Sequence, residues 1–197
     1  MAVMTRVYED IATAERARQS LESYGIAGVE VSVLGDERLR AHYDQDPTIR
    51  SAGNPSGTAT GASVGAVAGG GTGLLAGLGL IAIPGIGPLV AVGWLAAAAA
   101  GALGGAVVGG AVGALADIGV SEADAPVFDE ALRRGNVAVT VLFPEERRAD
   151  VVSALDIVPT VEFTDLRTRY EAEGWQYDEA EARRQERLRN INNIPPL

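Results

Sequence analysis

The 197-residue chain contains no cysteine, no lysine and a single histidine, and all 16 of its basic residues are arginine. Without lysine there is no Walker-type phosphate loop and no Schiff-base nucleophile. Without cysteine there is no disulfide, thiol nucleophile or thiolate metal site, and one histidine is too few for a His-rich zinc site within one chain. The net charge of −10 argues against broad electrostatic binding of nucleic acid. We therefore predict a non-enzymatic protein with no cofactor and no small-molecule substrate.

Charged residues are also absent from one long stretch, residues 51–116. Nineteen of the 25 glycines lie in it, between Gly53 and Gly113. Most elements of a globular protein have a face in water, so an uncharged stretch of this length indicates a segment shielded from water nearly all round. The first 20 residues carry charges that interrupt any signal-peptide core. We therefore expect the charged flanks to remain in the cytoplasm.

The N-terminal flank has the pattern of a β-α-β unit. Apolar residues alternate over residues 3–7 and again over residues 29–33, which is the spacing of strands. Between them lies a helical pattern that Asp10 can cap at its start and Gly25 can end.

The C-terminal flank repeats this pattern. Ser121 and Asp124 resemble a capping box before a short helix. A strand at 137–141, a helix at 144–155 and a last strand from Val161 to Phe163 then complete a second unit. Two β-α-β units, at 3–34 and 137–164, predict an α+β fold, the ferredoxin-like split β-α-β sandwich. It has a four-stranded antiparallel sheet with two helices on one face.

The uncharged stretch is predicted to be a Gly/Ala-rich helical hairpin inserted between the two halves. Each glycine destabilises a helix by roughly 1 kcal/mol relative to alanine, and this stretch contains many glycines. Close contact between two helices can compensate for this loss, and small residues at every fourth position permit such contact. A flexible linker would have fewer Leu, Ile, Val and Ala residues. The glycines of the two stripes are Gly61, Gly65, Gly69, Gly73, Gly77, Gly93, Gly101, Gly105, Gly109 and Gly113, and the turn between them contains Pro84, Gly85, Gly87 and Pro88.

Three arrangements of this hairpin are open. Residues 58–80 and 88–116 are each long enough to cross a bilayer, which needs about 20 helical residues, and two spans would return the chain to its starting side. However, bulky apolar residues gather at the tip, which favours a wedge in one leaflet. Alternatively, the hairpins pack together in a soluble oligomer. An exposed monomer is excluded, because so large an apolar surface would aggregate.

Candidate chemistry is weak. His42 lies near Asp44 and Asp46 and suits weak metal binding or base chemistry, but a solvated loop is the simpler interpretation. Residues 71–77 have the pattern G-x-G-x-x-x-G, yet the repeat of small residues explains these glycines better than a dinucleotide site does. The acidic residues at the start of the helix at 144–155 are expected to stabilise it, because the N-terminal end of a helix dipole is positive.

The tail after residue 166 is a different kind of segment. Residues 178–190 are dense in Glu and Arg, with spacings such as Glu179–Arg183 and Glu181–Arg184 that support a solvated helix. Trp175 and Tyr177 can dock that helix on the sheet or on a neighbouring subunit. Residues 190–197 are expected to be extended.

Three stretches resemble the general stress protein seventeen-M family, also described as heat-induced stress proteins. The first comprises residues 7–10 (Val-Tyr-Glu-Asp), 14–17 (Ala-Glu-Arg-Ala) and 31–34 (Val-Ser-Val-Leu). The second is the tip at 78–88, and the third runs from 113 to 120 and continues with Arg-Arg-Gly at 133–135 and a Val-rich strand. The resemblance covers about residues 3–165. It implies a bacterial stress-associated protein, often suspected of membrane association, and supplies no catalytic residues.

Four regions follow from these patterns. Residues 1–50 and 118–166 form the two halves of a head domain, 51–117 the glycine-zipper hairpin, and 167–197 the charged tail. We expect the protein to form a homo-oligomer and to associate with a lipid bilayer through the hairpin, with the head in the cytoplasm. A soluble cytoplasmic assembly with a shared hairpin core is the alternative, and a ligand-binding module is a third.

Overall fold

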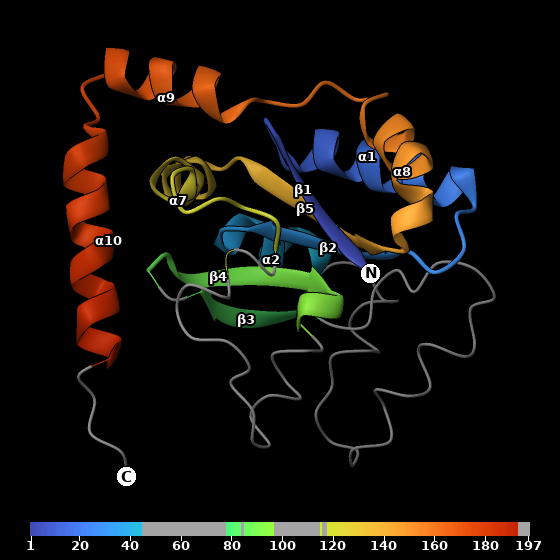
Figure 1. Ribbon diagram of the computed structural model, residues 1–197, viewed down its shortest axis with the longest axis horizontal. Helices are drawn as coiled ribbons and strands as arrows, with labels where there is room; N and C mark the ends of the chain where they lie inside the picture. The colour runs from blue at the N-terminus through green and yellow to red at the C-terminus, as the bar shows by residue number, and fades with distance from the viewer. Residues whose placement is uncertain (45–77, 84, 97–114, 116–117, 193–197) are drawn as a thin grey trace, which may run out of the picture.

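The computed structural model describes residues 1–44, 78–83, 85–96, 115 and 118–192, and has an α+β fold built on one antiparallel five-stranded sheet (Figure 1). The strand order is β1-β5-β2-β4-β3. The strands are β1 (Ala2–Tyr8), β2 (Glu30–Gly35), β3 (Leu78–Ile83), β4 (Gly87–Gly93) and β5 (Val137–Phe143). The helices are α1 (Ile11–Tyr24), α2 (Glu37–Tyr43), α7 (Ala125–Arg134), α8 (Arg148–Leu155), α9 (Phe163–Ala172) and α10 (Tyr177–Asn192), with a 3-10 turn at Glu145–Arg147.

The first predicted β-α-β unit is confirmed. The Asp10 side chain caps α1 by accepting a hydrogen bond of 2.7 Å from the Thr13 amide. Gly25 follows the helix with a φ of 59°, a left-handed conformation that suits glycine. Strands β1 and β2 each pair antiparallel with β5, so they run parallel to each other with β5 between them.

The second predicted unit is only partly correct. Strand β5 and helix α8 form, but the predicted strand from Val161 to Phe163 is wrong, because α9 begins at Phe163. The Val161 amide donates a backbone hydrogen bond of 2.8 Å to the Val7 carbonyl. The Phe163 ring meets that of Phe128 edge to face, with centroids 6.2 Å apart. The prediction of the strand depends on only two alternating apolar residues, Val161 and Phe163. A pattern this short does not distinguish a strand from an irregular segment that leads into a helix.

The central residues 78–93 form a β-hairpin, so the prediction of a helical tip is wrong here. Strand β4 pairs with β2, from Ser32 opposite Gly93 to Gly35 opposite Val90. The chain reverses between Ile83 and Gly87, at the residues for which a turn is expected. Leu, Ile and Val are compatible with a helix or a strand, and the open edge of β2 decides between them, because pairing satisfies its backbone groups.

Of the glycines predicted to pack helices together, Gly93 alone lies within the described residues, and its predicted role is wrong. It ends β4 with a φ of 111°, and a Cβ there would lie 2.1 Å from the Val31 carbonyl oxygen. Its missing side chain lets β4 approach β2, not one helix approach another. The other predicted packing positions lie outside the described residues: Gly61, Gly65, Gly69, Gly73, Gly77, Gly101, Gly105, Gly109 and Gly113.

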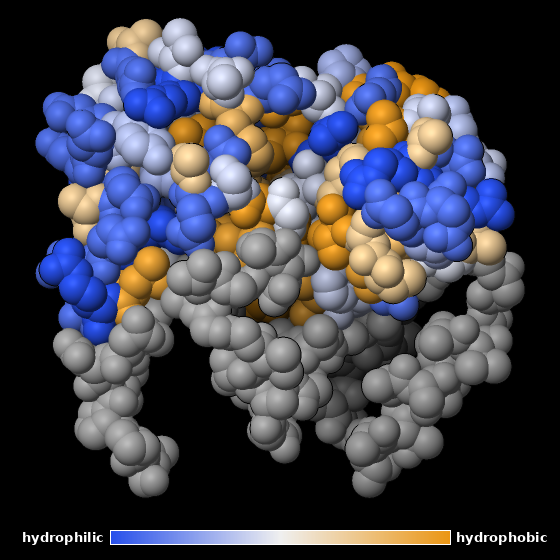
Figure 2. Space-filling view, viewed as in Figure 1, coloured by the Kyte–Doolittle hydropathy of each residue, from blue (hydrophilic) through white to orange (hydrophobic). Residues whose placement is uncertain are grey.

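Helices cover both faces of the sheet. Helices α1, α2 and α8 bury their apolar side chains on one face, and α1 packs against α8. Helices α7 and α9 pack on the other face around Phe128 and Leu166, which the sequence did not predict. On the side drawn in Figure 2, the surface over α10 is mainly hydrophilic and apolar residues gather nearer the middle.

The charged tail forms α9 and α10, and the predicted helix at 178–190 is confirmed. Helix α10 continues to Asn192, beyond the start of the predicted extended end. The tail is docked on the head, since the Tyr177 hydroxyl donates a hydrogen bond of 2.8 Å to the Ala123 carbonyl. Figure 1 shows α10 at one end of the molecule beside α7, away from α1 and α8.

The prediction of membrane insertion depends on residues 58–80 and 88–116, of which 58–77, 97–114 and 116 lie outside the described residues. Within the described ranges, no helix combines the length and the apolar character needed to cross a bilayer. The hairpin that joins the two segments belongs to the sheet of the head.

Candidate functional site

The side chains considered for chemistry from the sequence do not form a site in the described part of the chain. His42 is exposed on α2, with its ring edge to face with the neighbouring Tyr43. No group of three or more His, Asp or Glu side chains able to hold a metal occurs among the described residues. Asp46 and the glycine pattern at 71–77 lie outside them.

The acids before α8 act locally. A hydrogen bond of 2.6 Å from Arg148 stabilises the charged form of Glu145 and lowers the pKa of its carboxyl group. Both side chains are solvent-accessible, so this pair is a surface contact and not a catalytic arrangement.

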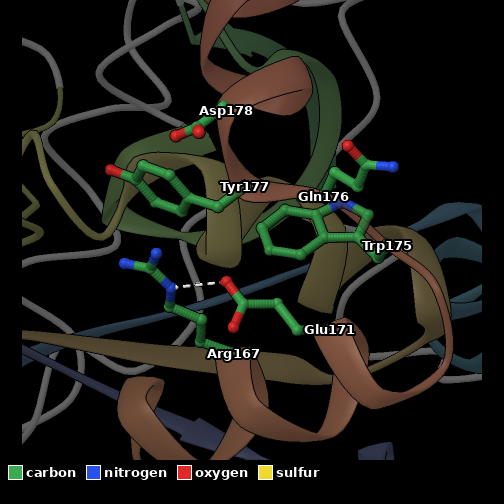
Figure 3. A pocket seen from close by; sticks show the side chains of 6 residues that line it. All are labelled: Arg167, Glu171, Trp175, Gln176, Tyr177 and Asp178. Carbon is green, nitrogen blue, oxygen red and sulfur yellow. Dashed lines mark hydrogen bonds and ion pairs between the residues drawn. The ribbon is translucent and has the colours of Figure 1, made fainter.

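A surface hollow of about 340 Å³ lies where α9 meets α10 (Figure 3). The Arg167 guanidinium lies over the Tyr177 ring, 4.0 Å from its centroid, and donates a hydrogen bond of 2.8 Å to Glu171. The same hollow is lined by Trp175, Gln176 and Asp178. The guanidinium of Arg167, the cation that lines the hollow, is already paired with Glu171 and stacked on Tyr177.

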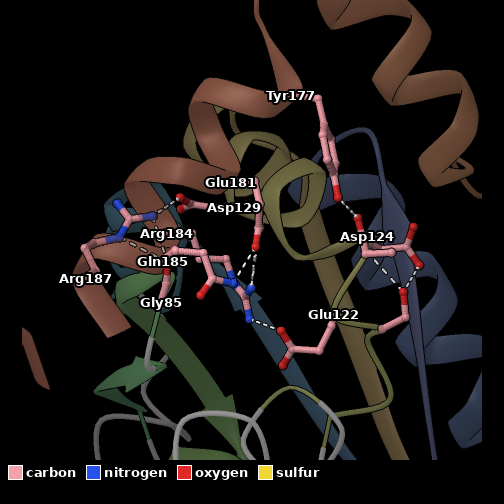
Figure 4. A network of polar contacts seen from close by, with 11 residues as sticks. Gly85, Glu122, Asp124, Asp129, Tyr177, Glu181, Arg184, Gln185 and Arg187 are labelled. Atoms are coloured by element: carbon pink, nitrogen blue, oxygen red, sulfur yellow. Dashed lines mark hydrogen bonds and ion pairs between the residues drawn. The ribbon is translucent and has the colours of Figure 1, made fainter. Parts of the chain in front are cut away.

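The most developed polar arrangement joins the hairpin turn to α10 (Figure 4). The Arg187 guanidinium donates two hydrogen bonds to the Gly85 carbonyl, from Nε at 3.1 Å and from Nη2 at 2.7 Å. Nη2 also lies 2.9 Å from an oxygen of Asp129 on α7. One side chain thus links three elements: the hairpin turn, α7 and α10.

Arg184, one turn earlier on α10, is buried, with 1% of its side chain exposed. It donates to Glu122 in the segment before α7, and its Nη1 lies 3.4 Å from Glu181 on its own helix. Its Nε is buried and has no hydrogen-bond partner within the described residues. Removing a guanidinium from water is costly, and here the pairing is incomplete, so the surrounding packing must hold this side chain in place.

Gly85 is the residue against which this arrangement packs. Its φ is 83°, and a Cβ there would lie 3.1 Å from Cγ of Arg184 and 3.1 Å from Cδ2 of Leu188. Gly87 also has a positive φ, but a Cβ there would meet nothing within 4 Å. The two glycines of the turn therefore differ in role. The absence of a side chain at Gly85 leaves space for α10, whereas Gly87 is needed only for its positive φ. Pro88 is exposed in β4 opposite Ala82, and Pro84 lies outside the described residues.

The contacts of Arg184 and Arg187 with other parts of the head are not predicted from the sequence. In a helix dense in Glu and Arg each arginine fits a solvated face, and the predicted ion pairs Glu179–Arg183 and Glu181–Arg184 do form, at 3.5 and 3.4 Å. The available signal is a stripe at helical spacing in which Tyr177, Ala180 and Leu188 accompany Arg184.

Comparisons with protein-family models, with curated proteins and with solved structures found no match to this chain.

Proposed function

We propose that this is a non-enzymatic, stress-associated protein that self-associates through its two uncharged segments, 51–77 and 97–114, which are carried by an α+β head. The observation that carries this proposal is the docking of hairpin 78–93 in the head sheet, in the middle of the uncharged stretch. The link with stress rests on the resemblance described above.

The docked hairpin divides the uncharged stretch into two segments whose ends are both held by the head. The described residues that flank these segments are Asp44 and Leu78 on either side of the first, and Ala96 and Leu115 on either side of the second. Crossing a bilayer and returning needs about 40 helical residues. Neither segment has that length, which supports self-association over a pair of full spans while the hairpin is docked.

Membrane insertion is the second candidate, favoured by the absence of charge from 51 to 116. With the hairpin docked, it takes the form of a wedge in one leaflet. Two full spans over 58–80 and 88–116 require β3 and β4 to leave the sheet, because both spans include residues of these strands.

We further propose that the head is a variant of the ferredoxin-like fold. In that fold the last strand pairs with the outer edge of the first strand. Val161 meets β1 there through one hydrogen bond to the Val7 carbonyl. The hairpin of β3 and β4 adds two strands beyond β2, at the opposite side of the sheet.

Light scattering after size-exclusion chromatography of the full chain, without detergent, tests self-association. We expect a discrete oligomer whose mass falls when Gly69 and Gly105 are both replaced by Leu, because bulky side chains keep the segments apart. Replacing Gly70 and Gly104 by Leu is the matched control off the stripes. A monomer at all concentrations, or equal masses for the two double variants, would overturn the proposal. Flotation of the same proteins with phosphatidylglycerol vesicles tests the membrane candidate.

A further inference from the structure

Among the described strands, the hairpin of β3 and β4 is joined to the rest of the sheet by the pairing of β4 alone, and β3 is the edge strand, although Ile83, Val90 and Val92 are buried in the core. Strand β4 joins β2 through the four residue pairs from Ser32 to Gly35, and within the described residues β3 pairs with β4 alone. Edge strands have fewer backbone bonds to break than central strands, so they open at lower free energy. The turn at the end of this hairpin depends on contacts from outside the sheet.

Those contacts come from the C-terminal helix. Arg187 holds the Gly85 carbonyl by two hydrogen bonds, and Arg184 and Leu188 lie against the Gly85 backbone. The neighbouring Ile86 is 1% exposed. Helix α10 therefore covers the turn at Gly85, beside a side chain that is buried in the core around α7.

The attachment of α10 includes polar contacts to three other parts of the head beside the packing of Leu188 and Tyr177. Arg187 reaches Asp129 on α7, Arg184 reaches Glu122, and Tyr177 reaches the Ala123 carbonyl. Glu122 is 45% exposed and Arg187 is 37% exposed, so water reaches one partner of each ion pair, while Arg184 and Asp129 are largely buried. An attachment of this kind separates more readily than an apolar core does, and it separates as a unit, because all three contacts lie on one helix.

We propose that α10 is a strap that holds the β3–β4 hairpin in the sheet and that its release controls the uncharged segment. When α10 detaches, Gly85 loses its partners, and the hairpin is free to leave β2. The uncharged stretch 51–116 is then no longer held at 78–93 by the sheet, and its whole length is enough for two membrane spans or for extended packing between copies. This inference rests on the proposed function, since it states how that function is regulated.

Hydrogen exchange of the full chain tests the strap directly. In Arg187→Ala we expect exchange of amides in 78–93 to rise about tenfold, while exchange in β5 is unchanged, because the loss is local. Arg183→Ala is the matched control, since Arg183 is 58% exposed on the same helix and lies 3.5 Å from Glu179 of that helix. Equal exchange of 78–93 in wild type, Arg187→Ala and Arg183→Ala would overturn the strap.

Arg184→Met serves as a second variant, because it fills the same space without the charge. Faster exchange confined to 78–93 supports the strap. If β5 exchange rises too, the head as a whole has been destabilised, and Arg187→Ala alone decides the matter.

The same variants separate failure of the strap from failure of the proposed function. Oligomer mass and flotation with phosphatidylglycerol vesicles are measured beside hydrogen exchange. Faster hairpin exchange with an altered mass or new flotation supports both proposals. Faster hairpin exchange with neither change leaves the strap standing and counts against the function of the uncharged segment. Unchanged hairpin exchange overturns the strap, whatever the oligomer does.

Discussion

The guanidinium of Arg187 donates two hydrogen bonds to the carbonyl of Gly85, which lies 102 residues earlier in the chain. The sequence predicts that the helix is solvated and that the turn is the tip of a membrane hairpin, but this contact joins the two. In the structure the turn belongs to the head, and the helix packs against it.

Substituting Gly85 tests how closely α10 covers the turn. Gly85→Ala introduces a side chain at a φ of 83° and against Arg184 and Leu188, so we expect the free energy of unfolding to fall by about 2–4 kcal/mol. Gly174→Ala is the control, since Gly174 has a φ of 94° with open space around it, and we expect a loss of about 1 kcal/mol. Urea denaturation measures both. Equal losses would mean that the α10 contact does not constrain Gly85.

Removing the buried arginine separates charge from volume. Arg184→Ala should lower the free energy of unfolding by about 2–3 kcal/mol, because it removes the contact to Glu122 and leaves space under α10. Arg184→Met should lose less than half as much, since it restores the packing. Arg183→Ala should stay within about 0.5 kcal/mol, as expected for an exposed ion pair. A loss in Arg183→Ala as large as that in Arg184→Ala would contradict the assigned roles.

The cap of α1 predicts a pH dependence. Hydrogen bonds from Thr13 lower the pKa of the Asp10 carboxyl group, first through the backbone amide. Since the folded pKa lies below the unfolded value of about 3.9, this stabilisation is complete above pH 4 and is lost as the pH falls through the folded pKa. Asp10→Ala should therefore cost about 1 kcal/mol at pH 7 and less at pH 2.5. Asp10→Asn, which caps without titrating, is the control, and a cost independent of pH would refute the assignment.

The core around α7 predicts the largest effect. Phe128 is fully buried and meets Phe163 at the start of α9, so Phe128→Ala should lower the free energy of unfolding by about 3–5 kcal/mol. Ile157→Ala, at a side chain that is 60% exposed, should change it by less than about 0.5 kcal/mol. Thermal or urea denaturation compares the two, and a loss in Phe128→Ala no larger than that in Ile157→Ala would argue against a second core on this face.

Local patterns predicted those elements whose signals lie within the element itself. Alternating valines predicted β2 and β5, and Asp10 and Gly25 marked the two ends of α1. The strand expected at Val161 failed because its pattern was short and Phe163 found a partner in Phe128, which lies 35 positions earlier. The contacts of α10 with Gly85, Glu122 and Asp129 were not predicted, because an arginine that can pair along its own helix also fits a solvated face.

The sequence by itself determined the composition that excludes thiol and lysine chemistry, the uncharged stretch from 51 to 116, and the β-α-β pattern of the first 35 residues. These properties depend on residue type and on spacing along a few turns of chain. Only the tertiary structure decided that residues 78–93 are strands and that Arg184 is buried, because both outcomes depend on partners distant in the chain. Residues 78–93 form strands because the open edge of β2 offers them backbone hydrogen bonds. Arg184 is buried because it contacts the turn at Gly85 and Glu122.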